Sequence, residues 1–290
     1  MQELLHQFEE LRKYIDDQLS RYLENKEGLL EGLYESIRYS LFSGGKRIRP
    51  IFCFLVGELF DIPKEKLTAT ACAVEMIHTS SLIMDDLPYM DDAITRRGKA
   101  SNHLVYGADV AALASMALLM RSYQIVLQDP SLPAAKKSCI AEKLASTTGL
   151  QGMVGGQYVD LRLLEKTMSP QVLEFIHAHK TASLFALSGT LAAEIGEASA
   201  AEIAAVENYA RNLGLAFQLA DDILDTDGSK QETGKSLKKD KCNFVQLYGL
   251  DKTKELAKDY TGKATDALQV FDGRNEKLVA LGTMLLDRRS

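Results

Sequence analysis

The stretch CAVEMIHTSSLIMDDLPYMD, residues 72–91, decides the fold class, because an apolar run with helical spacing ends in a group of acids. Its apolar residues recur every three or four positions, which is the period of a helix with one buried face. Pro88 disfavours helical geometry at the residue before it, so we expect the helix to end near Asp86. The end of this helix should therefore carry several carboxylates.

The same helical spacing recurs along the rest of the chain. Segments 108–127, 174–195 and 201–225 are periodic and rich in Ala, Leu, Glu and Met, which are good helix formers. Most of the six prolines stand between periodic runs, and no alternating strands with Asn-Gly turns occur. The sequence predicts an all-α protein of ten or more helices, forming a single domain over residues 1–290. Segments 110–127 and 181–196 are apolar nearly all round, which indicates core helices or an oligomer interface and makes a dimer plausible.

Composition narrows the class of protein. The 290 residues are 46% hydrophobic, enough for a large core, and the net charge of −6 argues against a nucleic-acid partner. The four cysteines are widely spaced without a metal-ligand pattern, and we interpret them as reduced, mostly buried thiols. The N-terminus lacks the apolar centre of a signal peptide, and no run of about 18 apolar residues predicts a membrane span. We expect a cytoplasmic protein.

Two groups of aspartates each follow an apolar helix. Aspartate at a helix C-terminus is unfavourable by about 0.3–1 kcal/mol, and neighbouring carboxylates repel one another, so cations are needed nearby. Residues three and four apart on a helix share one face, and clustered carboxylates suit Mg²⁺ that also holds phosphate oxygens. A solvated acidic face would explain one group better than two, and the spacing does not fit a calcium EF-hand. The groups are Asp85, Asp86 and Asp91, and Asp221, Asp222 and Asp225.

Two basic patches accompany the acids. One is GGKRIRP at 44–50, with Lys46, Arg47 and Arg49, and the other is RRGK at 96–99. Arginine offers a bidentate fork and lysine a point charge to phosphate oxygens. Two such patches with two acidic groups suggest two anionic ligands side by side, one held through metal and one by direct basic contacts.

With these motifs in this order, the chain resembles the trans-isoprenyl diphosphate synthases, the farnesyl and geranylgeranyl diphosphate synthase group. The resemblance implies a helical bundle around a central active-site cavity, working as a homodimer. It implies condensation of isopentenyl diphosphate with an allylic diphosphate, using about three Mg²⁺ ions, which Mn²⁺ can replace. The motifs are GGKRIRP, EMIHTSSLIMDDLPYMD, RRGK, GGQYVD, HKT, LAFQLADDILD and TGK.

The resemblance also implies a role for each matching residue. The six aspartates would hold metal, with Asp85 and Asp221 counted among the catalytic residues. Isopentenyl diphosphate would be bound by Lys46, Arg49, His78 and Arg97. The allylic diphosphate would be bound by Arg96, Lys180 and Lys235, with Thr181 and Gln218 beside the reacting carbons. Gln157 and Asp160 match the GGQxxD helix, whereas His177 and His179 are interpreted as ordinary.

Product length should depend on the helix before the first aspartates, where the family places a floor under the growing chain. Ser80 and Ser81 are small, so the floor should lie deeper, at Met76 and Ile77 or at Leu113 and Met116. We expect geranylgeranyl diphosphate, with farnesyl diphosphate or products of twenty-five or more carbons as alternatives.

Two departures from the family pattern leave questions open. Ala93 and Ile94 are apolar where further acids are usual, and the segment 236–243 is short, with Asn243 where a threonine is usual. A class I terpene cyclase is a rival hypothesis, but its second metal motif usually differs and GGKRIRP would have no clear use there. A non-catalytic subunit of a heteromeric synthase is another, although such a subunit should have lost metal ligands.

Overall fold

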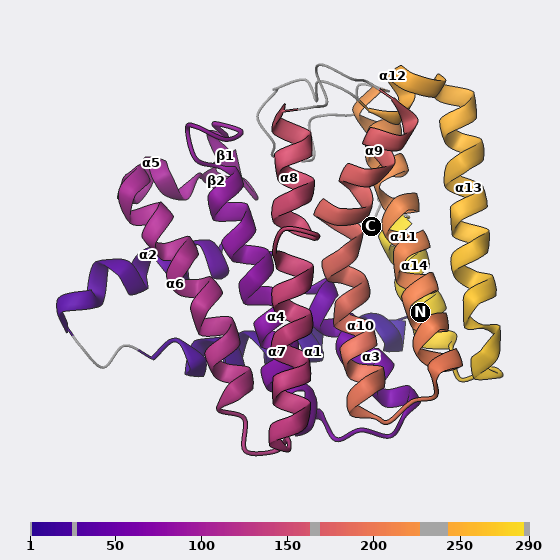
Figure 1. Ribbon diagram of the computed structural model, residues 1–290, viewed down its shortest axis with the longest axis horizontal. Helices are drawn as coiled ribbons and strands as arrows, with labels where there is room; N and C mark the ends of the chain where they lie inside the picture. The colour runs from indigo at the N-terminus through magenta and orange to yellow at the C-terminus, as the bar shows by residue number, and fades with distance from the viewer. Residues whose placement is uncertain (1, 25–27, 163–168, 227–242, 287–290) are drawn as a thin grey trace.

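The computed structural model describes residues 2–24, 28–162, 169–226 and 243–286, and these are mostly helical (Figure 1). The all-α prediction is confirmed: the described residues form fourteen α-helices, one π-helix, two short 3-10 helices and one two-stranded hairpin. The elements are α1 Gln2–Tyr22, η1 Gly28–Leu30, α2 Glu31–Leu41, α3 Ile48–Leu59, α4 Lys64–Asp85, β1 Thr95–Arg96, β2 Lys99–Ala100, α5 Asn102–Tyr106, α6 Ala108–Leu127, α7 Ala134–Thr148, α8 Met153–Arg162, α9 Pro170–Ile176, η2 His177–Ala182, α10 Ser183–Ile195, α11 Ala200–Thr226, α12 Phe244–Tyr248, α13 Leu250–Ala267, η4 Leu268–Phe271 and α14 Glu276–Leu286.

Local chemistry explains several helix ends. Helix α4 ends at Asp85 with Asp86 as its C-cap, two residues before Pro88, as the sequence predicted. Ser199 and Glu202 form a reciprocal capping box at the start of α11. Asn243 accepts a hydrogen bond of 2.8 Å from the backbone N–H of Gln246 and so caps α12.

The core is centred on α3, α4 and α10, whose side chains are buried on nearly every face. Phe52 of α3 stacks on Phe185 of α10 at 4.5 Å between ring centroids and lies 5.6 Å from the ring of Tyr209 on α11. The expectation of a core helix at 181–196 is thus confirmed, although its first two residues, Thr181 and Ala182, belong to the π-helix η2.

Helix α6 is different, because it packs on α4 with one face and leaves another uncovered. Leu113, Met116, Met120 and Leu127 are each at least half exposed along it. By length and apolar composition, α4 and α6 would each pass as a membrane span, but α4 is the central core helix. Of the cysteines that the structure describes, Cys53 and Cys72 are buried and Cys139 is exposed, which fits the expectation of mostly buried thiols; Cys242 lies outside the described residues.

The two acidic helix ends lie on the same side of the bundle. In Figure 1, α4 runs up to the hairpin β1–β2, and α11 ends at the top beside α12. The upper ends of α8 and α9 lie between them in this view, and η2 packs against α8, α9, α10 and α11. Asp85 and Asp86 stand at the end of α4, and Asp221 and Asp222 stand near the end of α11.

Candidate active site

The first aspartate group is drawn together by a tight turn after α4. The backbone N–H of Asp91 donates to the carbonyl of Asp85 at 2.9 Å, which folds the chain back over the helix end. Partial burial raises the pKa of Asp85 to about 6 despite the neighbouring Lys180, and Asp91 and Asp86 act in the same direction as burial. The turn thus brings Asp91 back beside the helix end that carries Asp85 and Asp86.

Asp86 is already engaged by an arginine of the hairpin. The Nε of Arg96 donates to both carboxylate oxygens of Asp86, at 3.0 and 3.2 Å, and its Nη2 donates to Oδ1. Burial would lower the pKa of Arg96, but the hydrogen bonds and charge of Asp86 raise it overall. Arg96 therefore stands beside the metal-type carboxylates, where the resemblance places a contact to the allylic diphosphate.

Lys180, on the π-helix η2, acts electrostatically on the same aspartate group. Its Nζ forms an ion pair of 2.8 Å with Asp160 of α8, and the charges of Asp85 and Asp160 raise its pKa against the effect of burial. A π-helix is rare and often occurs at functional sites. Thr181 is the next residue of η2 and is partly buried.

Two glycines allow η2 to lie close to its neighbours. A Cβ on Gly156 of α8 would be 2.9 Å from the backbone nitrogen of Lys180, and one on Gly214 of α11 would be 2.9 Å from the Cβ of Ala182. Side chains at these two positions would push the helices apart. The geometry of Lys180 thus depends on small residues in both adjacent helices.

The second aspartate group lies near the end of α11. Asp222 is buried, and its Oδ2 accepts a hydrogen bond of 2.8 Å from the backbone N–H of Phe244 at the start of α12. Asp221 precedes it, and Gln218 lies one turn earlier; both are partly buried. The side chain of Asp225, and Lys235 as a whole, lie outside the described residues, so their predicted roles are not tested.

His177 was interpreted as ordinary, but it adjoins these residues. Its ring stacks on Phe244 with 5.1 Å between centroids. Burial lowers its pKa to about 4, although Asp160 and a hydrogen bond with Gln218 act in the opposite direction. Its ring therefore touches the elements that carry Lys180, Gln218 and Asp222. Spacing alone did not reveal this, because the contact partners come from other helices.

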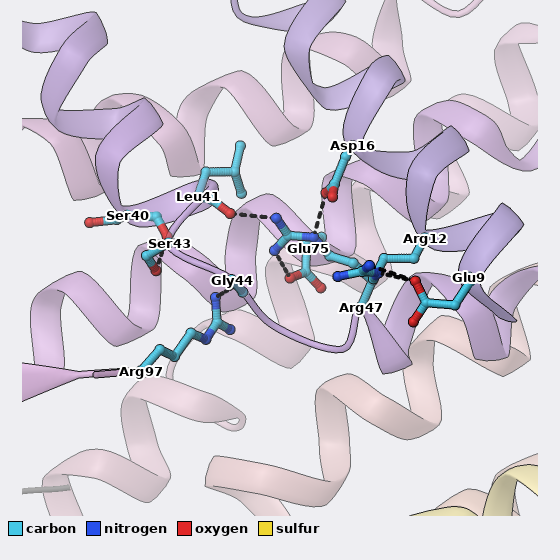
Figure 2. Close-up of polar contacts among 10 residues, drawn as sticks. All are labelled: Glu9, Arg12, Asp16, Ser40, Leu41, Ser43, Gly44, Arg47, Glu75 and Arg97. Atoms are coloured by element: carbon cyan, nitrogen blue, oxygen red, sulfur yellow. Dashed lines mark hydrogen bonds and ion pairs between the residues drawn. The ribbon is translucent and has the colours of Figure 1, made fainter. Parts of the chain in front are cut away.

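The glycines at the start of the GGKRIRP segment contact Arg97, in the turn of the hairpin. Arg97 Nη1 donates to the carbonyl of Gly44 at 2.5 Å (Figure 2). A Cβ on Gly45, whose φ is +123°, would lie 2.8 Å from Arg97 Cζ, so the glycine is needed for this contact. Lys46 is exposed and Arg49 is partly buried. The structure thus places residues of both predicted basic patches in contact.

His78 lies beneath the basic patch on α4. Burial, followed by the charges of Arg49 and Arg97, holds the pKa of His78 well below its ordinary value. Burial also lowers the pKa of both arginines, and Glu75 opposes it in each. A neutral imidazole with several cationic neighbours fits a place where negative charge is bound.

The proposed floor residues fall into two sets. Met76 and Ile77 are buried in the core, and Ser81 is partly buried. Ser80 faces α6, where its hydroxyl donates to the carbonyl of Ser115 at 2.8 Å, and Ser115 Oγ returns a hydrogen bond of 2.9 Å to the Ser80 carbonyl. Leu113 and Met116 are 57% and 59% exposed, so within this one chain they face outward. Their role as deeper stops stays a prediction.

The aspartates suit a Mg²⁺ ion that is also coordinated by water and substrate phosphates. Among the residues that the structure describes, no three His, Cys, Asp or Glu side chains are grouped closely enough to hold an ion by themselves. Mg²⁺ usually takes only one or two carboxylates and completes its shell with water and substrate phosphates. Oxygen donors at two helix ends match that use. The residues suited to it are Asp85, Asp86, Asp91, Asp221 and Asp222.

Comparison with known proteins agrees with this geometry. The family model described as polyprenyl synthetase matches residues 31–272. A chloroplastic geranylgeranyl pyrophosphate synthase from Capsicum annuum is 42% identical over 264 residues, covering 88% of this chain and 71% of the relative. A geranylgeranyl diphosphate synthase from Cyanophora paradoxa is 36% identical, covering 99% and 97%. A solved geranyltransferase from Legionella pneumophila superposes with a TM-score of 0.89 at 30% identity, covering 99% of this chain and 98% of the other.

The chain belongs to the polyprenyl synthetase family, which confirms the resemblance drawn from its motifs. It is therefore placed among the prenyltransferases of isoprenoid biosynthesis.

Proposed function

We propose that this protein condenses isopentenyl diphosphate with an allylic diphosphate to make geranylgeranyl diphosphate. The observation that carries the proposal is the charge arrangement at one end of the bundle. At the end of α4, Asp86 is bonded to Arg96 and its charge acts on the pKa of Arg97, which in turn contacts Gly44 of the GGKRIRP segment. The charge of Lys180 acts on the pKa of Asp85, and the end of α11 lies on the same side of the bundle (Figure 1). One diphosphate would be bound at the acids through metal, and the other directly at the basic patch.

Each group in this arrangement has a distinct task. Mg²⁺, when bound, would neutralise charge on the departing diphosphate. Arg96 and Lys180 would add donors to that diphosphate, and Thr181 and Gln218 would lie beside the reacting carbons. Lys46, Arg49, His78 and Arg97 would hold isopentenyl diphosphate in position for its alkene to attack. Lys235 would join the first set, and Asp225 the metal ligands.

The chemistry needs positioning more than it needs a side-chain nucleophile. Allylic ionisation develops charge that fixed cations and dipoles stabilise, and two held substrates react as if at high effective concentration. The proton lost after condensation would pass to the bound diphosphate. The protein's own contribution is to hold both diphosphates and to exclude water from the carbons between them.

A twenty-carbon product is supported by two lines of argument. Relatives that are 42% and 36% identical are named geranylgeranyl diphosphate synthases. Ser80 and Ser81 are small where an aromatic side chain would stop growth early. The solved relative from Legionella pneumophila is named a geranyltransferase, and the product assay distinguishes the two product lengths.

We also propose a homodimer of single-domain chains in the cytoplasm. The exposed apolar face of α6 would be covered by a second copy of the chain, because a face of that kind in water favours association. The same helix passes a length and composition test for a membrane span, so the oligomeric state in solution decides between these uses.

The direct test is a product assay with the purified chain, Mg²⁺ and labelled isopentenyl diphosphate. Dimethylallyl, geranyl and farnesyl diphosphate are supplied separately, and product length is read by mass spectrometry. Twenty carbons would support the full proposal, and fifteen would keep the reaction but move the floor. No elongation by the folded chain with any starter would overturn it in favour of a non-catalytic subunit, with 236–243 as the first segment to replace.

A further inference from the structure

Arg47 is part of the basic motif GGKRIRP, but its side chain is bonded inside the protein. Its guanidinium donates from Nε to Asp16 Oδ1 at 2.8 Å, from Nη1 to Glu75 Oε1 at 2.8 Å, and from Nη2 to the Leu41 carbonyl at 2.5 Å. Figure 2 shows its guanidinium between Asp16 of α1, Leu41 of α2 and Glu75 of α4, whereas Arg97 contacts Gly44. Its side chain is only 2% exposed.

The backbone of Arg47 favours this direction. Its φ is +52°, a left-handed conformation that non-glycine residues adopt only when the surroundings hold them there. The neighbouring Lys46 is exposed while Arg47 is buried, so two adjacent cations of the motif have different surroundings. The left-handed residue also begins α3, on which Arg49 lies.

Glu75 is the reason a buried arginine is needed here. Its side chain is 2% exposed, and its charge partly opposes the effect of burial, which lowers the pKa of both Arg49 and Arg97. A buried carboxylate must find a cation. Without Arg47, the nearest cations left for Glu75 would be the two arginines that the proposed function assigns to a diphosphate.

Arg49 has a hydrogen-bond donor that the fold does not use. Its Nε is buried and has no hydrogen-bond partner within the described part of the chain. A buried, unpaired guanidinium nitrogen is costly, so it indicates a group kept for a ligand rather than for the fold. This state persists only while the carboxylate of Glu75 is held elsewhere.

We propose that Arg47 and Glu75 are a buried positioning pair. Arg47 holds the Glu75 carboxylate away from Arg49 and Arg97, so that these two keep their donors for the diphosphate of isopentenyl diphosphate. Arg47 itself touches no substrate. The inference rests on the proposed function for the identity of that ligand, and it adds a reason why a third cation in the motif faces inward.

A pair of variants separates this role from a simple structural tie. Arg47→Met leaves Glu75 free to occupy the arginines, and we expect the KM for isopentenyl diphosphate to rise at least tenfold. The KM for the allylic diphosphate should stay within threefold. Adding Glu75→Gln removes the misplaced charge, so the double variant should return the first KM to within threefold of wild type. A structural tie predicts no such recovery.

Arg12→Met is the matched control. Arg12 also forms an ion pair with a carboxylate, Glu9, but on the exposed face of α1 (Figure 2). It should leave both KM values unchanged. Circular dichroism melting of every variant establishes that each is folded at the assay temperature.

The outcomes are distinguishable. A wild-type chain that does not consume isopentenyl diphosphate defeats the proposed function, and the same series is then read by calorimetric binding of inorganic pyrophosphate. An active wild type with a double variant no better than Arg47→Met, or with both KM values raised equally, overturns the positioning pair. If Arg47→Met does not fold, Arg47→Lys with and without Glu75→Gln replaces it, with a smaller rise and the same recovery expected.

Discussion

Replacing Gly156 by alanine should damage catalysis more than it damages the fold. The added Cβ would meet the Lys180 backbone nitrogen at 2.9 Å, the His179 Cβ at 3.1 Å and the His179 carbonyl carbon at 3.3 Å. Favourable contacts between carbon atoms occur at about 3.5–4.0 Å. Because backbone atoms cannot rotate out of the way, α8 and η2 would have to separate by roughly 0.5–1 Å.

The two consequences differ in size. Overpacking costs about 1–3 kcal/mol, and the gain of about 1 kcal/mol in helix propensity offsets part of that, so we expect a net loss of stability of about 0–2 kcal/mol. The same separation stretches the 2.8 Å pair between Lys180 of η2 and Asp160 of α8. A misplacement of about 1 Å at a catalytic group can cost roughly 10²-fold in rate. Turnover should therefore fall by about 10–100-fold.

Steady-state turnover with isopentenyl and allylic diphosphates, beside thermal melting, measures both effects. Gly262→Ala on α13 is the matched control, because this helical glycine is exposed and a Cβ there would meet nothing within 4 Å. It should leave turnover unchanged and add about 0.5–1 kcal/mol of stability. If folded Gly156→Ala turned over within twofold of wild type, the reasoning about close packing at Lys180 would be wrong.

Three further changes test other parts of the site. Ser80→Phe should shorten the main product from twenty to fifteen carbons in mass spectrometry, and an unshortened product would show that position 80 does not limit chain length. Ser80→Ala loses the 2.8 Å hydrogen bond to Ser115, which costs about 1 kcal/mol of stability, and should keep product length. Asp222→Asn keeps an acceptor for the Phe244 N–H but loses the charge. Activity should fall at least 10²-fold and require a higher Mg²⁺ concentration, while the melting temperature changes little. An unaltered Mg²⁺ titration would exclude Asp222 as a ligand. Burial lowers the pKa of His177 from 6.5 to about 4, so between these pH values the unfolded chain binds more protons than the folded chain, and the stability that His177 contributes is lost as the pH falls from 6.5 to 4. The urea midpoints at pH 7 and pH 5 should therefore differ less in His177→Gln than in wild type. Equal differences in the two proteins would refute this.

Helix boundaries at the site could be predicted because they depend on neighbouring residues. Pro88 acts on Leu87 through sterics that need no tertiary contact, and α4 does end at Asp85. The aspartates of one group lie within seven residues of sequence, so their proximity also followed from local geometry. The family assignment rested on such local motifs and was confirmed for the same reason.

The hydrogen-bond and ion-pair partners of individual side chains could not be predicted, because they depend on contacts between distant segments. Arg47 and Arg49 look equivalent in GGKRIRP, and only the fold brings Glu75 and Asp16 to the first of them. The π-helix was missed as well. Its apolar spacing over a few residues is that of an α-helix, yet it is the element that carries Lys180 toward Asp160.

The two diphosphate subsites differ in their local balance of charge. On the side proposed for the allylic diphosphate, Arg96 is paired with Asp86 and Lys180 with Asp160. The carboxylates of Asp85, Asp86, Asp91 and Asp160 outnumber these two cations. Burial raises the pKa of Asp85 to about 6, although the charge of Lys180 acts in the opposite direction. Such a place would repel a diphosphate unless divalent cations came with it, which explains why aspartates and a phosphate ligand can share one site.

On the other side the balance is reversed by one internal pairing. Arg47 takes up Glu75, and with it the carboxylate that would otherwise cancel part of the charge of Arg49 and Arg97. The burial that lowers the pKa of both arginines also means that water competes less for their donors. Under the proposed function, a diphosphate would then be bound here without metal. The difference between a metal-dependent and a metal-free subsite would thus follow from which carboxylates are neutralised inside the protein, and Arg47→Met should move the second subsite toward the character of the first.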